Sequence, residues 1–212
     1  MKFFSTDGGL YKFMTNLFSV FKINMLWLLC SLPIVTIGAA TIAAYDVTMK
    51  MVDDEEGYVA KQFIQAFKAN LKRGIPLGLL GLLSVYAVWL DFSLFNQLED
   101  NPMVLLIAGI ISLYIVVIAF IYAFPLQARY ENTIPQTLKN SANISLRYFG
   151  RTLFLVIILL IEIVIIFWNV TTLFVGILIG PACMIYTISG VSKYIFRQIE
   201  KEPGAVSNPE KL

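Results

Sequence analysis

The sequence contains no histidine and few charged residues. Lysine, arginine, aspartate and glutamate together make up 14% of the 212 residues, whereas 58% are hydrophobic. About a quarter of the residues in a soluble domain are charged, so this chain has too little polar surface to cover a water-soluble globule. The lack of histidine also removes the commonest metal ligand and general base. We therefore expect an integral membrane protein without a histidine-based catalytic or metal site.

The small number of cysteines, the small net charge and the lack of catalytic motifs exclude further classes. Cys30 and Cys183 lie in apolar sequence, where buried hydrophobic side chains are a better interpretation than a disulfide or metal ligands. The net charge of +2 comes without a basic stripe, so nucleic acid is not an expected partner. Phosphate-binding loops, nucleophile elbows and metal-ligand clusters are absent from the sequence. We expect no catalytic residues, no cofactor and no metal, and hence no enzyme.

Long apolar runs predict membrane-spanning α-helices. A helix needs about 20 mostly apolar residues to cross a bilayer, whereas a β-barrel would show alternating strands of about ten residues. The runs that meet or approach the helical length are residues 75–95, 103–124, 152–168 and 171–194. The polar end, residues 198–212, is expected to be a disordered cytoplasmic tail, which leaves residues 1–197 as a single transmembrane domain.

The first 50 residues allow two interpretations. In one, residues 10–22 form an interfacial helix and residues 23–44 form a single bent span, which gives five spanning helices. In the other, a hairpin turns at Pro33, with one helix before it and a second over residues 34–51, which gives six.

The distribution of lysine and arginine favours the hairpin. These residues collect in the segments 57–73, 128–151 and 193–201, whereas the short loops 96–102 and 169–171 contain none. Cytoplasmic loops of membrane proteins carry an excess of lysine and arginine, so we expect the three basic segments in the cytoplasm. A single first span would put the lysine-containing N-terminus outside. We therefore expect six helices, with five as the alternative, in the cell membrane with both termini in the cytoplasm.

Two of the basic segments have the pattern of amphipathic helices. Residues 59–73 place apolar side chains on one face and lysines on the other, and residues 134–149 also have one apolar face. The second segment begins with a capping-box sequence from Thr133 to Gln136. We expect both segments to form cytoplasmic elbow helices on the membrane surface. The predicted fold class is thus an all-α, polytopic transmembrane bundle of six helices with two amphipathic elbows.

Glu162 is the most conspicuous polar residue within the apolar runs. A carboxylate in lipid costs several kcal/mol unless it is paired or protonated, so it is either functional or holds helices together. Under the hairpin interpretation Lys22 is similarly deep, ~15 Å below the predicted outer end, compared with ~10 Å for Glu162. We predict that Lys22 and Glu162 form a buried polar pair between the first and fifth helices.

Candidate helix breaks occur at Pro33, Gly38, Gly180 and Pro181. Broken helices surround the substrate in several transporter folds. Turn and kink geometry is the favoured explanation here, and the small residues between positions 38 and 44 have the spacing of close helix packing.

Four stretches carry a resemblance to a known family. They are LYKFMTNLF (10–18), LPIVTIGAATIAAYDV (32–47), DDEEGYV (53–59) and FIQAFKANLKRG (63–74). Together they resemble the YesL-like family, a domain of unknown function in bacterial membrane proteins. Ala39 departs from that pattern, in which proline follows the glycine more often. The resemblance implies a multi-pass bacterial protein, often encoded beside carbohydrate ABC transporters, and it implies no catalytic or binding residues.

The expected function is that of a non-enzymatic accessory component of carbohydrate uptake or sensing. The resemblance suggests ABC permease subunits or a membrane sensor as partners, in addition to membrane lipids, and a homo-oligomer is a further option. The alternative is a small-solute transporter or channel in its own right, which Glu162 and the candidate helix breaks motivate.

Overall fold

The computed structural model of the chain describes residues 9–53, 57–97 and 103–201. All regular structure in these residues is helical. The elements in order are α1 (Gly9–Ser31), the 3-10 helix η1 (Ile34–Thr36), α2 (Ile37–Val52), α3 (Val59–Gln97), α4 (Met103–Phe120), α5 (Ala123–Arg129), α6 (Ile134–Arg147), α7 (Phe149–Ile166) and α8 (Val170–Glu200).

Six helical stretches in the described residues are long and apolar enough to cross a membrane. They begin at Lys12, Ile34, Val59, Met103, Phe149 and Val170. α1 ends at Ser31 and η1 begins at Ile34, so a turn at Pro33 separates the first two stretches. The polytopic all-α fold with an N-terminal hairpin is confirmed, and the five-helix alternative is wrong.

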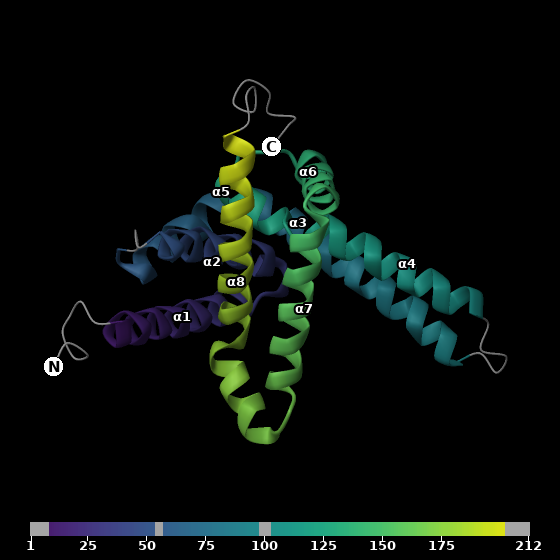
Figure 1. Cartoon of the computed structure of the whole chain (residues 1–212), viewed down its shortest axis with the longest axis horizontal. Coiled ribbons are helices and arrows are strands. Elements are labelled where there is room, and N and C mark those ends of the chain that lie inside the picture. The colour runs from purple at the N-terminus through teal and green to yellow at the C-terminus, as the bar shows by residue number, and fades with distance from the viewer. Residues whose placement is uncertain (1–8, 54–56, 98–102, 202–212) are drawn as a thin grey trace.

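The helices form two hairpins around a central helix. α3 packs against α4, α7 packs against α8, and α2 contacts α1, α3, α5 and α8. Most of α2 is buried, and the largest hydrophobic cluster of the described residues includes Ala40, Ala43, Ala44 and Val47. The α3–α4 hairpin and the α7–α8 hairpin leave this centre in different directions (Figure 1). Both hairpins therefore expose long apolar faces, which lipid or another membrane protein would cover.

Only one of the two predicted elbows is a separate helix. Residues 59–73 are the first part of α3, because neither Gly74 nor Pro76 ends that helix. Proline removes only its own N–H from the helical ladder, and neighbouring helices support such positions in membrane proteins. α3 is ~58 Å long at 1.5 Å per residue, so part of it extends past a hydrocarbon core about 30 Å thick.

The second elbow is a separate helix, α6. It begins at Ile134 as expected, but the Thr133 side chain makes no capping hydrogen bond, so the predicted capping box is wrong. The buried residues of α6 are Thr137, Asn140, Ser141, Ile144 and Ser145. Ser141 and Ser145 donate hydrogen bonds to the carbonyl of Ile118 in α4. On the apolar face, Ile134 and Leu138 pack against a buried cluster, whereas Leu146 is exposed and would lie against lipid.

The C-terminal helix is longer than predicted. α8 continues to Glu200, so the start of a disordered tail at residue 198 is wrong. Gln198 accepts a hydrogen bond from Arg151, and Glu200 is bound by Arg129 and Tyr130, so tertiary contacts hold the last helical turn. Residues 202–212 lie outside the described residues.

Candidate functional site

Glu162 lies on α7 and faces α8. Its Oε1 accepts a hydrogen bond of 2.6 Å from Thr187 Oγ1. Its Oε2 is buried and has no hydrogen-bond partner among the described residues. A carboxylate with one unsatisfied buried oxygen is costly in an apolar surrounding, so this oxygen is free to accept a hydrogen bond from an added donor.

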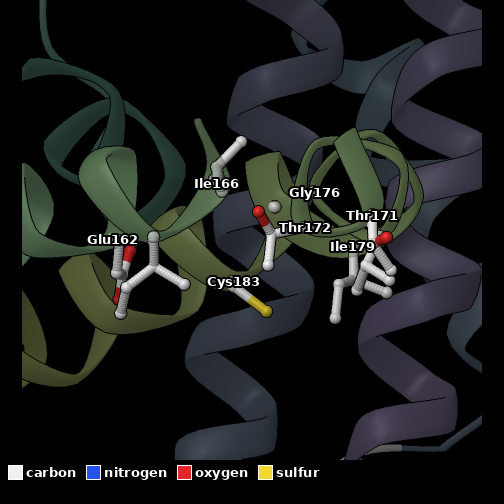
Figure 2. Close-up of a pocket in the computed structure, with 10 residues that line it drawn as sticks. Glu162, Ile166, Thr171, Thr172, Gly176, Ile179 and Cys183 are labelled. Carbon is white, nitrogen blue, oxygen red and sulfur yellow. The ribbon is translucent and has the colours of Figure 1, made fainter. Parts of the chain in front are cut away.

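A groove of about 260 Å³ runs beside Glu162 between α7 and α8. Figure 2 shows the residues that line it, which come from the end of α7 and from the first half of α8. Threonines, glycines and a cysteine make up much of the α8 side, and isoleucines contribute on both helices. Glu162 is the only aspartate, glutamate, lysine or arginine in this lining. The groove therefore combines apolar walls with one carboxyl group.

Two glycines of this groove have a packing role. A Cβ atom on Gly176 would lie 2.6 Å from Ile166 Cγ2, and one on Gly180 would lie 2.9 Å from Ile166 Cδ1. The absence of side chains at these positions lets Ile166 of α7 enter the surface of α8. This is the close approach that a small-xxx-small spacing allows.

The predicted pair of Lys22 and Glu162 does not form within the chain. Lys22 is exposed, and its Nζ lies 4.2 Å from the ring centroid of Phe18. Neither Lys22 nor Glu162 takes part in an ion pair of the described residues. The reason is the rotation of α1, which turns Ile23 and Asn24 toward the core and Lys22 away from it.

Asn24 takes the buried polar position that the sequence analysis gave to Lys22. Its Nδ2 donates to the carbonyls of Ile177 and Leu178, both at 2.9 Å, and its Oδ1 accepts from the N–H of Ala182 at 3.2 Å. Pro181 has no N–H to donate to Ile177, which is four residues earlier. The Asn24 amide thus replaces the helical hydrogen bond that proline removes, and it fixes α1 against α8.

The other predicted breaks are also structural. Pro33 precedes η1 in the turn between α1 and α2, and Gly38 lies inside α2. A Cβ atom on Gly38 would lie 2.1 Å from the Gly74 carbonyl oxygen and 2.6 Å from Gly78 Cα. α2 and α3 therefore meet backbone to backbone at this glycine, and the predicted close packing is confirmed. Gly180 and Pro181 both remain within α8.

A second helix break, between α4 and α5, was missed by the sequence analysis. Ser141 Oγ accepts from the N–H of Tyr122 and donates to the carbonyl of Ile118, both at 3.2 Å. These two backbone groups are four residues apart and would bond each other in a regular helix. Ser141 therefore inserts into the ladder as Asn24 does in α8. Serine in an amphipathic elbow gave no signal of this contact.

Charged side chains join the end of α2 to the last turns of α8. Lys193 is buried, donates to the carbonyl of Met49 at 2.6 Å and pairs with Asp53, which also pairs with Arg197. The hydrogen bond from Lys193 holds the pKa of Asp53 below its usual value, with a further contribution from Arg197 and an opposing one from partial burial. One turn deeper, Thr48 Oγ1 and Ser189 Oγ are 2.6 Å apart.

A second polar cluster ties α8 to α5. Arg129 donates to both carboxylate oxygens of Glu200, at 3.0 and 2.9 Å, and Tyr130 donates to Oε1 at 2.6 Å. Burial, and then the hydrogen bond to Glu200, raises the pKa of the Tyr130 hydroxyl. In the described part of the chain, no group of three or more cysteine, aspartate and glutamate residues could hold a metal ion. These clusters therefore act as clamps between helix ends.

The comparisons with known proteins concern the N-terminal part of the chain. Residues 20–92 match the model of a family described as a protein of unknown function, DUF624. This segment includes the second half of α1, the turn at Pro33, α2 and most of α3. It contains three of the four stretches that resemble the YesL-like family, namely residues 32–47, 53–59 and 63–74. No curated protein and no solved structure matches the chain. Over less than half of its length, this multi-helix membrane protein is thus similar to the family of unknown function DUF624.

Proposed function

We propose that this chain is a non-enzymatic accessory protein that acts in the plane of the membrane by contacting other membrane proteins of carbohydrate uptake or sensing. The observation that carries the proposal is the divergence of two hairpins that expose apolar faces (Figure 1). Leu83 and Trp89 are exposed on α3, and Phe154 and Val164 on α7. Shape-complementary packing against a partner helix is the main source of affinity between membrane helices.

The buried polar groups hold helices together, which supports the role of the protein as a scaffold. Asn24 and Ser141 satisfy backbone groups at helix breaks, and Lys193 holds the end of α2. Groups that are fully engaged in such bonds stabilise one arrangement of helices. The interior therefore serves to present the two hairpins.

The identity of the partners rests on the resemblance to the YesL-like family. That resemblance implies a setting of carbohydrate ABC transporters, so the partners are ABC permease subunits or a membrane sensor. We place the ends of α2 and α8 with the basic residues around them in the cytoplasm, because lysine and arginine mark that side. Arg129, Arg151, Lys193 and Arg197 all lie at this end of the molecule.

The alternative function is a small-solute transporter or channel. Glu162 supports it, because a carboxylate oxygen without a partner borders a groove in a predicted spanning region. Intramembrane acids mark ion and substrate pathways in many transporters. Proton- or cation-driven uptake by the purified protein in liposomes, lost in Glu162→Gln, would favour this function.

Photocrosslinking in native membranes tests the accessory function. A photoreactive phenylalanine analogue replaces Leu83 on α3 or Phe154 on α7, and Tyr58, which is exposed outside the hairpins, serves as the matched control. We expect adducts with a carbohydrate permease subunit or sensor, identified by mass spectrometry, at the two hairpin positions and not at Tyr58. Lipid adducts alone, or the same proteins at all three positions, would contradict the proposal.

A further inference from the structure

We propose that two copies of this chain associate in the membrane, with Lys22 of each copy reaching the α7–α8 groove of the other and pairing with Glu162. The inference is independent of the proposed accessory function. The groove would bind the exposed face of α1 from the second copy, which is apolar with one lysine at its centre.

Two residues of opposite charge lie unpaired in the predicted membrane spans. Lys22 and Glu162 both lie in stretches that are long and apolar enough to cross a membrane. Neither has an ion-pair partner among the described residues. Charged residues in spanning segments almost always pair, because an isolated charge is costly in hydrocarbon. Two opposite charges that are unpaired in one chain can satisfy each other between two chains.

The surface of α1 around Lys22 is apolar and exposed. Met14 is 55% exposed, Phe18 58% and Leu29 63%, and Lys22 is exposed between them. At 100° per residue these four positions fall on one face of the helix. The Phe18 ring supports the Lys22 ammonium group at 4.2 Å. α1 thus presents an apolar ridge with a single cation near its middle.

The α7–α8 groove has the complementary form. Thr172 and Cys183 of α8 line the groove that Glu162 borders (Figure 2), whereas Ile166 of α7 already covers Gly176 and Gly180. Thr187 occupies one oxygen of Glu162, and Oε2 is left without a donor in the described chain. A lysine ammonium group carries three donors and no acceptor, which is what this oxygen lacks.

Lys22 and Glu162 lie at similar depths in the membrane, as their positions relative to α8 indicate. Asn24 bonds Ala182, and Glu162 bonds Thr187, which is five residues further along α8 or ~7.5 Å. Lys22 precedes Asn24 by two residues, and the lysine and glutamate side chains are long enough to cover the remaining offset. The resident α1 touches α8 at Leu178 and Ala182, whereas Gly176, Gly180 and Cys183 line the groove. The partner's α1 can therefore approach the groove without displacing the resident one.

A two-fold axis between the two copies gives a closed dimer, in which no binding patch is left for a third copy. In an isologous dimer each surface patch meets its counterpart twice, so one axis creates two equal Lys22–Glu162 pairs. Both charges of both chains are then satisfied, and no further copy is recruited. This is the reason to prefer a dimer over a filament.

Charge reversal in differently tagged chains tests the pairing. Lys22→Glu alone places two acids at each contact, and Glu162→Lys alone places two lysines there, so each variant should lose self-association by about tenfold or more, the factor that 1.4 kcal/mol represents. A mixture of the two variants restores an opposite pair at both contacts. We therefore expect co-purification and energy transfer between tagged chains in liposomes to return only in the mixture.

Cysteine crosslinking provides a second arm with smaller substitutions. Cys183 lines the groove, so Lys22→Cys in a Cys30→Ala background should give an oxidised dimer through Cys183. Leu83→Cys in the same background is the control, because Leu83 is exposed on the other hairpin and should give none. Monomeric wild-type protein in liposomes, unchanged association in either single reversal, or equal crosslinking at Lys22→Cys and Leu83→Cys would overturn the proposal. If the reversed chains fail to fold, the crosslinking arm decides.

Discussion

At the scale of single residues, a neutral amide holds the centre of the molecule. Asn24 is completely buried, and its three hydrogen bonds go to the backbone of α8 around Pro181. A neutral side chain can satisfy these groups without the desolvation cost of an ion. The break at Pro181 is therefore a defined joint between α1 and α8.

Replacement of Asn24 by leucine should destabilise the protein. Asn24→Leu leaves the carbonyl of Ile177 without its donor, and we expect a loss of about 1–3 kcal/mol, measured by thermal unfolding in detergent. Asn16→Leu on the same helix is the matched control, with little expected change. Adding Pro181→Ala restores a helical N–H for Ile177 and should recover part of the loss. Equal melting of the two leucine variants would show that the joint contributes nothing.

The stability of the folded protein should decrease at low pH because of Asp53. Its pKa is lowered in the folded chain, chiefly by the hydrogen bond from Lys193. Folding is then favoured by the ionised form above the ordinary carboxyl pKa, and this contribution is lost as the pH falls through the lowered folded value. Asp53→Asn should therefore be less stable than the wild type at pH 6, and the difference should shrink below pH 4, in thermal melts over that range. A constant difference across these pH values would refute the clamp.

The residue roles could be predicted from the sequence only in part. Glu162 was identified because a carboxylate in an apolar run is costly wherever it lies. The prediction that Lys22 pairs with Glu162 within the chain was wrong because helical periodicity alone does not fix which face of α1 turns inward. The packing of Ile23 and Val20 against α2 and α8 decides that rotation.

At the scale of elements, glycine positions set the distances between helices. Gly38 of α2 meets Gly74 and Gly78 of α3, and Gly176 and Gly180 of α8 accept Ile166 of α7. The spacing of the small residues between positions 38 and 44 is visible in the sequence, so close packing of α2 could be predicted. The fate of the two elbows could not, because whether residues 59–73 continue into α3 depends on tertiary support around Gly74 and Pro76.

A methyl group at Gly38 should disrupt the α2–α3 contact. Gly38→Ala would place its Cβ against the backbone of α3, which cannot move without shifting the helix. We expect a loss of several kcal/mol, of the order seen for overpacked cores, or failure to accumulate in the membrane. Gly190→Ala in α8 is the control, since nothing lies within 4 Å of the added atom, and helix propensity favours alanine there by about 1 kcal/mol. Similar melting temperatures for both variants would argue against backbone contact.

At the scale of the whole molecule, the α3–α4 and α7–α8 hairpins present two separate lateral faces to the membrane. Polar clamps gather α2, α5 and α8 at one end, and from there the hairpins diverge (Figure 1). Hydropathy predicts the number of spans but not their divergence, because lipid-facing and partner-facing apolar residues look the same in the sequence.

Membrane topology tests the six-helix account most directly. In a Cys30→Ala, Cys183→Ala background, single cysteines replace Leu32, Tyr58, Val170 or Lys201, which are all exposed. The account predicts that an impermeant maleimide added to intact cells labels Leu32→Cys and Val170→Cys. Tyr58→Cys and Lys201→Cys should react only after the membrane is opened. Labelling of Tyr58→Cys in intact cells, or of Leu32→Cys only after opening, would contradict the hairpin at Pro33 and with it the six-helix arrangement.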